Sequence, residues 1–351
     1  MAPSLPGAVA LDAVGGDNAP EVTVQGALEV VERFGIPVLL VGPHRTVRRE
    51  LGRFRKLPDG LELVDAPDVV TMDDPPVVVL RKKRRSSLTV CAELVGEGHA
   101  VAMVTAGNTG AAWVAAKARI GLIDGIERPA LAAMLPSAKG HTLVLDVGAT
   151  IECRPEHLLR FALMGSIYAD AVLGVENPRV GLISVGEEEG KGGRRVREQH
   201  EALKEAGVNF IGNVEGRDIF LGDVDVVVCD GFTGNVILKV AEGVGELLVN
   251  VLKEETRRSP VYSAGLLAAK GAFRNLKRRV DYSEYGGAPL LGVRGPCLIG
   301  HGRSNAKAIV NAVRSAAAYA ASDAVGQIAR RAGGLVARGA DRAPKGSDSD
   351  A

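Results

Sequence analysis

The sequence predicts an α/β fold, with an open, mostly parallel, twisted sheet and helices on both of its faces. Short apolar runs rich in β-branched residues alternate with longer segments of helical spacing. Four of these runs end in turns where Gly stands beside Asn, Asp, Ser or Thr, and such turns hold the ligands of open parallel sheets. The four turns are Asp12–Asn18, Thr105–Gly110, Asp230–Asn235 and Gly300–Asn305.

Residues 1–7 are expected to be loose, and the chain then alternates between strands and helices. The predicted strands of the first third are Val9–Asp12, Pro37–Val41, Leu61–Val64 and Ala100–Val104. The predicted helices are Glu21–Phe34, a polar helix after Val41, and Ser87–Glu97. In Glu21–Phe34 the apolar residues recur at helical spacing, at Val24, Ala27, Leu28 and Val31.

The middle of the chain continues the same alternation. A hairpin is predicted from Ala130–Leu135 and Thr142–Asp146, and further strands from Arg179–Val185, Asn209–Gly212 and Val224–Cys229. Helices are predicted for Glu156–Val172, for the segment that ends at Ala206, and from Asn235 to Leu252. Asp230 is thus expected to end a strand and Asn235 to open a helix.

The C-terminal part begins with Ser259–Arg279, predicted as a protruding, basic, amphipathic helical segment. A strand over Leu290–Ile299 and a helix over Ala306–Arg331 follow. The Gly-, Ala-, Asp- and Ser-rich residues 333–351 are predicted to be disordered. We therefore expect residues 8–332 to form a single large α/β domain with room for two lobes.

Composition restricts the class of protein. The 351 residues carry 43 basic and 42 acidic side chains, so overall charge gives no reason to expect nucleic acid. The four cysteines, Cys91, Cys153, Cys229 and Cys297, form no CxxC pair and are predicted to be buried thiols. The sequence lacks a signal-peptide pattern and an uninterrupted membrane span, so a cytoplasmic protein is expected.

The turn after Val224–Cys229 predicts an anion site. Backbone N–H groups at the start of a helix lack intrahelical partners, and the helix dipole places positive charge there. Three other turns of the same kind suggest that several strand ends share one polar pocket.

Ten sequence blocks between Leu11 and Ile309 resemble the bacterial phosphate acyltransferase family, the PlsX type. The blocks are LDAVGGDNAP, RKKRRSS, TAGNTGA, LDVGATIECRPEHL, ENPRVGL, GEEEGKG, GNVEGRDIF, VDVVVCDGFTGNV, RVDYSEYGGAPLLGV and HGRSNAKAI. The chain departs from the family pattern at Val14, Arg85, Thr150 and Glu152. The resemblance implies a dimer with a fold like that of isopropylmalate dehydrogenases and phosphotransacetylases.

The resemblance also implies a reaction, the reversible transfer of a fatty acyl group from acyl carrier protein to inorganic phosphate for phospholipid synthesis. A phosphate oxygen would attack a thioester carbonyl. This chemistry needs a phosphate site, oxyanion donors and an apolar groove. It requires no nucleophilic Ser or Cys, and we expect no cofactor and no metal.

The candidate site residues lie at the four turns and on nearby basic side chains. Proposed catalytic residues are His301, Lys307, Asn235 and Asp230, with His301 favoured for proton transfer. Proposed substrate- and phosphate-binding residues are Asp12, Gly15, Gly16, Asn18, Asn108, Thr109, Lys191 and Ser304. The alternative for each is an ordinary cap or turn, and acids such as Asp12, Asp17 and Asp230 suit orientation better than Mg²⁺ binding.

Two basic segments are candidate contact surfaces. Arg81, Lys82, Lys83, Arg84 and Arg85 would dock the acidic carrier protein, or would form a solvated helix face. Leu266, Leu267 and Phe273, beside basic residues, would contact an anionic membrane transiently, or would pack on the partner subunit. The run Arg81–Arg85 has no interleaved aromatics, which disfavours a nucleic-acid site there.

Three rival functions stay open at this point. The turn Gly300–Asn305 lacks the third Gly of a dinucleotide fingerprint, which disfavours a nicotinamide-dependent dehydrogenase. A coenzyme A-dependent phosphotransacetylase and a non-catalytic regulator that binds acyl carrier protein are the other two.

Overall fold

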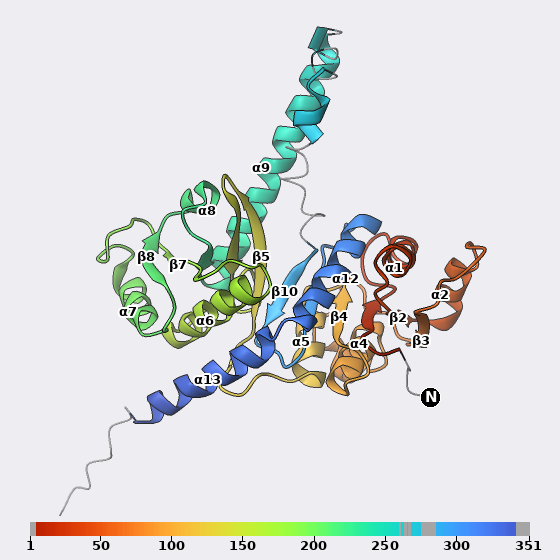
Figure 1. Cartoon of the computed structure of the whole chain (residues 1–351), viewed down its shortest axis with the longest axis horizontal. Coiled ribbons are helices and arrows are strands. Elements are labelled where there is room, and N and C mark those ends of the chain that lie inside the picture. The colour runs from red at the N-terminus through yellow and green to blue at the C-terminus, as the bar shows by residue number, and fades with distance from the viewer. Residues whose placement is uncertain (1–4, 260, 263–264, 266–267, 275–285, 342–351) are drawn as a thin grey trace, which may run out of the picture.

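The computed structural model describes residues 5–259, 261–262, 265, 268–274 and 286–341 (Figure 1). All described strands join one sheet of eleven strands, in the order β3-β2-β1-β4-β11-β10-β5-β6-β9-β7-β8. The predicted α/β class with a mostly parallel sheet is confirmed. The single domain with room for two lobes stays a prediction.

The first half of the sheet is parallel. Its strands are β1 (Val9–Asp12), β2 (Val38–Gly42), β3 (Leu61–Asp65), β4 (Ala102–Thr105) and β11 (Cys297–Ile299). The helices of this half are α1 (Glu21–Phe34), α2 (His44–Leu51), α3 (Val78–Arg81), α4 (Ser87–Gly96), α5 (Thr109–Arg119) and α12 (Ala306–Ala321). Side chains alternate between the two faces, so Val9 and Leu11 join one buried cluster while Ala8 and Ala10 join the other.

The second half of the sheet is also parallel, but it runs in the opposite direction. Its strands are β6 (Gly140–Leu145), β7 (Val180–Ile183), β8 (Phe210–Val214) and β9 (Val226–Val228). Two antiparallel strands, β5 (Ala130–Ser137) and β10 (Ala288–Leu291), join the halves. The helices of this half are α6 (Pro155–Ala171), α7 (Gly193–Lys204), α8 (Asp218–Leu221), α9 (Gly231–Arg258) and α13 (Ala324–Asp341).

The reversal places the carboxyl ends of the two halves opposite each other. Ile299 of β11 pairs with Thr105 of β4 and with Ala288, the first residue of β10. The last residue of β10, Leu291, pairs with Ala130, and β5 in turn pairs with the end of β6. Leu145, the last residue of β6, pairs with Ala132 and is therefore level with Pro289, one residue from Ala288. The two sets of strand ends thus differ by about 3.4 Å along the strand direction, and β10 and β5 separate them laterally. The sequence predicts that these ends meet at one edge of a mostly parallel sheet, whereas they face each other across β10 and β5, because the sheet reverses direction there.

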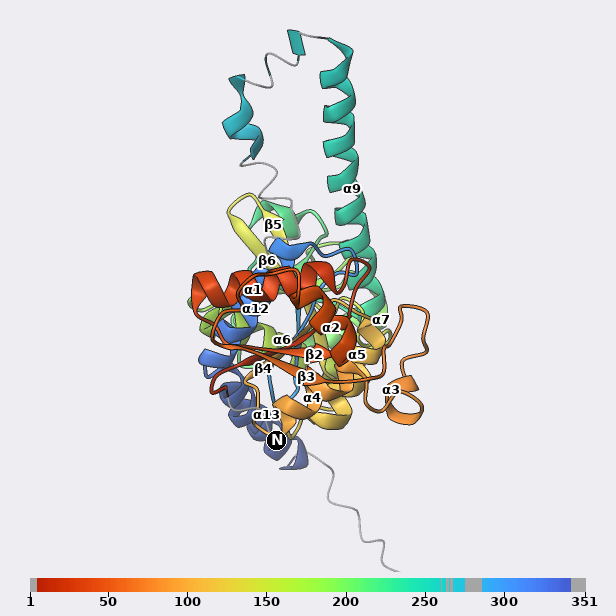
Figure 2. The ribbon, with the colours of Figure 1, turned by 90° about the vertical axis from the view of Figure 1, so that its right-hand side faces the viewer.

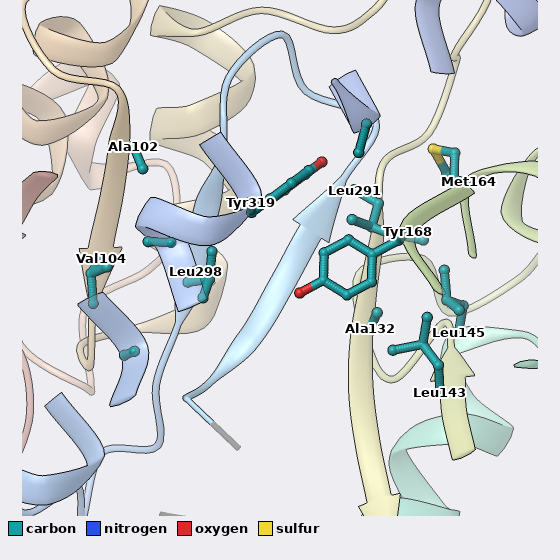
Figure 3. Packing of buried hydrophobic residues seen from close by; sticks show 14 of the residues in the cluster. Ala102, Val104, Ala132, Leu143, Leu145, Met164, Tyr168, Leu291, Leu298 and Tyr319 are labelled. Carbon is teal, nitrogen blue, oxygen red and sulfur yellow. The ribbon is translucent and has the colours of Figure 1, made fainter. Parts of the chain in front are cut away.

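A pair of tyrosines fills the seam between the halves. Tyr168 of α6 and Tyr319 of α12 meet edge to face, with ring centroids 5.1 Å apart (Figure 3). Burial raises the pKa of both phenols. The seam is thus packed as part of the buried core.

Four sequence predictions about elements were wrong in detail. Helix α9 begins at Gly231, not at Asn235, because the Asp230 carboxylate caps it by accepting from Thr233 N at 2.8 Å. The predicted strand Leu290–Ile299 is two antiparallel strands, because a turn at Gly292 (φ +95°) reverses the chain.

The long C-terminal helix also differs from its prediction. It is interrupted after Ala321, where Ser322 adopts an extended conformation, and α13 then continues to Asp341. The predicted disorder over residues 333–351 is therefore wrong for 333–341. The remaining residues, 342–351, lie outside the described part of the chain.

Helix α9 leaves the body of the protein and projects beyond it (Figures 1 and 2). Of the predicted membrane-contact residues, Leu266 and Leu267 lie outside the described residues, whereas Phe273 is half-buried within a short helical stretch, 270–274. Within the residues that the structure describes, no helix has the length and apolar character required to cross a bilayer.

Candidate active site

A cavity of about 760 Å³ lies where the two sets of strand ends face each other. It is bounded by β5 and β10, by α5 on one side and by the start of α9 on the other. Its polar lining comes from Thr105, Thr109, Asn235, Lys239, Glu242, His301 and Ser304. Three of the four predicted turns thus contribute residues to one cavity.

The fourth turn, between β1 and α1, is hydrogen-bonded to the loop that carries His301 and Ser304. Asp17 N donates to Gly302 O at 2.8 Å, and Asn18 Nδ2 donates to Ser304 O at 3.4 Å. Gly15 is required there, because a Cβ on it would lie 2.3 Å from Asp12 Oδ2. Gly16 adopts φ +102° with Gly302 O close by. These residues hold the His301 loop in place and do not themselves line the cavity.

Asp12 is buried at the end of β1. Its carboxylate accepts from Thr105 Oγ1 at 2.7 Å and from Val14 N at 3.2 Å. Burial raises the pKa of Asp12, while these hydrogen bonds act in the opposite direction. These contacts tie the ends of β1 and β4 together, and a contact of Asp12 with phosphate stays a prediction.

Asn108 caps α5 and also anchors the preceding linker. Its Oδ1 accepts from Ala111 N at 2.9 Å, and its Nδ2 donates to the carbonyls of Met72 and Asp74, each at 3.0 Å. Both ends of the amide are therefore occupied by the protein. The next residue, Thr109, lines the cavity with the first turn of α5, where backbone N–H groups and the helix dipole favour an anion.

Asn235 enters the cavity from the second turn of α9. Within the described residues its side-chain amide makes no hydrogen bond, and its Oδ1 lies 3.8 Å from where a Cβ on Gly148 would stand. Asp230 does not line the cavity, because its carboxylate is used as the α9 cap. Asn235 is thus positioned to reach a ligand, and Asp230 is positioned to start its helix.

Asp146 holds the loop that faces Asn235. Its buried carboxylate accepts from Leu131 N at 2.9 Å and from three backbone N–H groups of its own loop, Gly148, Ala149 and Thr150. Burial raises its pKa, against the effect of these four donors. The sequence places this aspartate at a strand end without indicating a role for it.

His301, Glu242 and Lys239 form a charged cluster at the cavity. His301 Nε2 lies 4.0 Å from Glu242 Oε2, and Lys239 Nζ donates to the same Glu242 oxygen at 2.9 Å. Burial lowers the pKa of His301, Glu242 and Asp17 raise it, and Lys239 and Arg303 lower it further. The imidazole is thus held towards its neutral form.

Ser304 lies in the same loop as His301. It is buried, and its hydroxyl donates to His301 O at 2.6 Å, so the hydroxyl proton is used in a hydrogen bond within the loop. Its neighbour Asn305 is the cap of α12 and accepts from Ala308 N at 2.9 Å.

Lys191 and Lys307 do not line the cavity. Lys191 is exposed in the loop before α7, and Lys307 is exposed in the first turn of α12. Both basic residues therefore stay predictions as site residues, without a place in the cavity wall.

Lys239 and Glu242 line the cavity but were not among the residues predicted from the sequence. Together with Asn235 and Leu238 they follow the spacing i, i+3, i+4 and i+7, which places all four on one face of a helix. That polar stripe was visible in the sequence. The glycine-flanked turn points to the strand end alone, so the sequence by itself assigned these two residues no role.

The basic run lies beside the linker that reaches the cavity. Lys83 Nζ pairs with Asp74 at 2.5 Å and lowers the pKa of that carboxyl to about 2. Arg81, Lys82, Arg84 and Arg85 are exposed. Met72 and Pro76 of the same linker line the cavity, so the linker connects the basic run to the cavity wall.

One group of side chains has the composition of a metal site, away from the cavity. Ligand atoms of Glu189, His200 and Glu201 lie within 4.8 Å of one another. The ammonium of Lys204 lies 3.0 Å from Glu189 and 3.1 Å from Glu201. A lysine thus already supplies the positive charge that these carboxylates would otherwise take from an ion.

Comparison with solved structures places the fold. A phosphotransacetylase from Streptococcus pyogenes superposes with a TM-score of 0.63 at 15% identity, over 90% of this chain and 94% of that one. A 4-hydroxythreonine-4-phosphate dehydrogenase from Klebsiella pneumoniae gives a TM-score of 0.51 at 17% identity, over 88% and 98%. At these identities the likeness is one of fold, and it confirms the expected phosphotransacetylase-like architecture.

The sequence of the chain also matches a protein family and its members. A family model described as fatty acid synthesis protein matches residues 8–327. The phosphate acyltransferase of Citrifermentans bemidjiense is 49% identical over 323 residues, 92% of each chain. That of Geotalea uraniireducens is 50% identical over 312 residues, 89% of this chain and 90% of the relative. The resemblance found in the ten sequence blocks is therefore confirmed, and the chain belongs to this family of fatty acid synthesis proteins and phosphate acyltransferases.

Proposed function

We propose that the protein transfers a fatty acyl group from acyl carrier protein to inorganic phosphate, giving an acyl phosphate for phospholipid synthesis. The observation that carries this proposal is the cavity itself. It combines donors suited to an oxyanion with an apolar wall, and it lies beside an exposed basic surface.

The reaction balances without an acid or base supplied by the protein. An oxygen of monohydrogen phosphate attacks the thioester carbonyl carbon, and the carbonyl electron pair moves onto its oxygen. The oxyanion then re-forms the carbonyl, the C–S bond breaks, and the thiolate leaves with the electron pair. The proton of the phosphate ends on the thiol, so the products are acyl phosphate and free carrier thiol.

The start of α5 is the position in the cavity that is best suited to bind phosphate. Thr109 and Gly110 line the cavity within the first helical turn, and Asn235 faces them from α9. Backbone N–H groups and an amide donate hydrogen bonds without adding negative charge. Lys239 supplies a nearby positive charge.

The apolar wall of the cavity is the position that is best suited to bind the acyl chain. Trp113 and Val114 of α5, Leu131 and Met134 of β5, and Leu238 of α9 share this wall. A thioester bound with its carbonyl among the polar residues would place its alkyl chain against these side chains. Removing that chain from water would favour binding by about 0.8 kcal/mol for each buried methylene.

The carrier protein would approach over the basic run. Arg81, Lys82, Arg84 and Arg85 are exposed on and after the short helix α3, and the linker beside them reaches the cavity. Complementary charge would speed encounter with an acidic partner and would make it salt-dependent.

The partner for the projecting helix is best explained as a second copy of the chain. Helix α9 exposes apolar residues at helical spacing, and Val240, Leu247 and Leu248 are each 58% exposed or more. This stripe faces away from the residues that line the cavity, by the 100° step of a helix. A homodimer would cover it, in agreement with the dimer that the family resemblance implies.

Contact with a membrane is proposed for the segment that follows α9. Val261 and Tyr262 are exposed there, a few residues along the chain from the basic Arg257 and Arg258 at the end of α9. A long-chain acyl phosphate is strongly apolar, so delivery from the cytoplasm to the inner face of the membrane would be aided by transient contact.

One assay tests the function against its rivals. The protein is mixed with phosphate and either long-chain acyl carrier protein or acyl-coenzyme A, and acyl phosphate is trapped with hydroxylamine. We expect hydroxamate with the carrier protein. Product only with acyl-coenzyme A would favour a phosphotransacetylase, binding of the carrier without turnover would favour a regulator, and reduction of NAD⁺ with a hydroxy acid would favour a dehydrogenase.

A further inference from the structure

The backbone around His301 fixes which ring nitrogen carries the proton. Arg303 N lies 3.2 Å from His301 Nδ1 and donates its hydrogen to it. A backbone N–H can only donate, so Nδ1 must accept and cannot carry a hydrogen. The neutral imidazole is therefore protonated at Nε2.

The charged groups around the ring favour this neutral form. Lys239 and Arg303 place positive charge near the imidazole, and burial opposes its ionisation, while Glu242 and Asp17 act in the opposite sense. Protonation of Nδ1 would in addition break the contact with Arg303 N. The neutral form with hydrogen on Nε2 is the one that the surroundings stabilise.

Nε2 is on the side of the ring that faces Glu242, at the cavity. The separation of 4.0 Å from Glu242 Oε2 exceeds a hydrogen bond, so the carboxylate attracts the N–H end of the ring without accepting its proton. Lys239 Nζ, 2.9 Å from the same oxygen, offsets the negative charge that would otherwise repel phosphate.

We infer that His301 acts as a neutral hydrogen-bond donor, through Nε2–H, to the thioester oxygen as it becomes an oxyanion, and that Glu242 is a positioning residue that orients the ring. This assignment rests on the proposed acyl transfer to phosphate. It replaces the proton-transfer role expected from the sequence, because the phosphate proton passes to the thiolate and leaves no proton for a base to remove. A neutral imidazole polarises a carbonyl in this way in other enzymes.

Nitrogen-15 NMR of the histidine rings tests the tautomer without any turnover. With His301 assigned by comparison with His301→Gln, we expect a protonated Nε2 and an unprotonated Nδ1 at neutral pH. A spectrum with hydrogen on Nδ1 would overturn the inference whether or not the protein is an acyltransferase.

Kinetics of two variants then separate a donor from a base. His301→Ala is expected to lower kcat about 100- to 1,000-fold, the usual loss for one oxyanion donor. His301→Gln keeps an N–H donor and is expected to retain at least about tenfold more activity than His301→Ala. Equal rates for the two variants would support a general base instead. His44→Gln, an exposed histidine outside the cavity, is the matched control and should behave as wild type.

An NMR titration of the His301 ring tests Glu242. Its charge raises the pKa of His301, so Glu242→Gln should move the titration of the His301 ring nitrogens to lower pH. An unmoved titration would mean that Glu242 only packs against its neighbours. Thermal melts of each variant show whether it folds. Wild-type enzyme that forms no acyl phosphate would refute the proposed function, whereas active wild type with equal Ala and Gln variants would refute this inference alone.

Discussion

The Thr105 hydroxyl donates to Asp12 Oδ2 at 2.7 Å and so ties the end of β4 to the end of β1. Both residues are buried, and Gly107 N in turn donates to Thr105 Oγ1 at 3.0 Å. This short chain of hydrogen bonds fixes the turn that starts α5, and with it the wall of the cavity where Thr109 lies. The buried Asp12 carboxylate thus stabilises the position of residues that line the cavity without lining it itself.

Thr105→Val should therefore destabilise the protein by about 1–3 kcal/mol at pH 7, because it leaves a buried carboxylate with one donor fewer. Burial already raises the folded-state pKa of Asp12 above its usual 3.8, so the carboxyl favours folding below that pH and this contribution is lost as pH rises through the folded-state pKa. Loss of the hydroxyl raises the pKa further. The destabilisation, measured by urea unfolding, should be larger at pH 7 than at pH 4.

Thr150→Val provides the matched control for this experiment. Thr150 is also buried, but its hydroxyl has no hydrogen-bond partner among the described residues. The change should be neutral or slightly stabilising. Equal losses of stability in Thr105→Val and Thr150→Val would show that the Asp12 contact contributes nothing specific.

Substitutions of Asn108 should separate its contact with the linker from its capping of α5. Asn108→Ser keeps a side-chain cap for α5 but loses the amide donor to the carbonyls of Met72 and Asp74. Asn108→Ala loses both. We expect proteolysis within residues 71–83 to accelerate in both variants, and an additional loss of about 0.5–2 kcal/mol of stability only in Asn108→Ala. A linker that is cut no faster in Asn108→Ser would contradict the anchoring role.

Charge reversal should reveal the docking surface for the carrier protein. Lys82→Glu with Arg84→Glu leaves the Lys83–Asp74 ion pair in place and should raise KM for acyl carrier protein by up to about 30-fold, since two exposed contacts contribute about 1 kcal/mol each at most. The dependence of KM on salt should also flatten. Arg48→Glu with Arg49→Glu makes the same change of charge on α2 and should leave KM unchanged. An equal effect of the two pairs would mean that only net charge matters.

The apolar stripe on α9 should control oligomeric state. Val240→Glu with Leu248→Glu places two charges on the exposed stripe, so light scattering should report a monomer where the wild type is a dimer. Val185→Glu changes a residue that is 79% exposed elsewhere and should leave the dimer intact. A wild-type protein that is monomeric at micromolar concentration would remove the basis for the proposed dimer.

The sequence predicted the fold class because strands and helices leave local periodic patterns. The buried strand Val226–Val228 and the amphipathic helix Glu21–Phe34 were found where their patterns indicated. Errors arose where a tertiary contact decides a boundary. Gly234 allows α9 to start early, for example, because a Cβ there would lie 1.9 Å from Asp146 O.

The candidate site was found in part. His301, Ser304, Thr109 and Asn235 line the cavity, while Asp12, Asp230 and Asn108 use their polar groups to hold strand ends, a cap and a linker. A polar residue beside a strand end has the same local pattern in either case. Only the direction of its side chain separates the two, and that direction depends on distant neighbours.

By itself the sequence determined the α/β class, the family and the four glycine-flanked turns, because each of these depends on residues close together along the chain. The tertiary structure decided that the sheet reverses at β10, that Lys239 and Glu242 meet His301, and that one strand-end turn supports the others from behind. These relations depend on strand register and on packing between segments far apart in the sequence, and no local pattern encodes them.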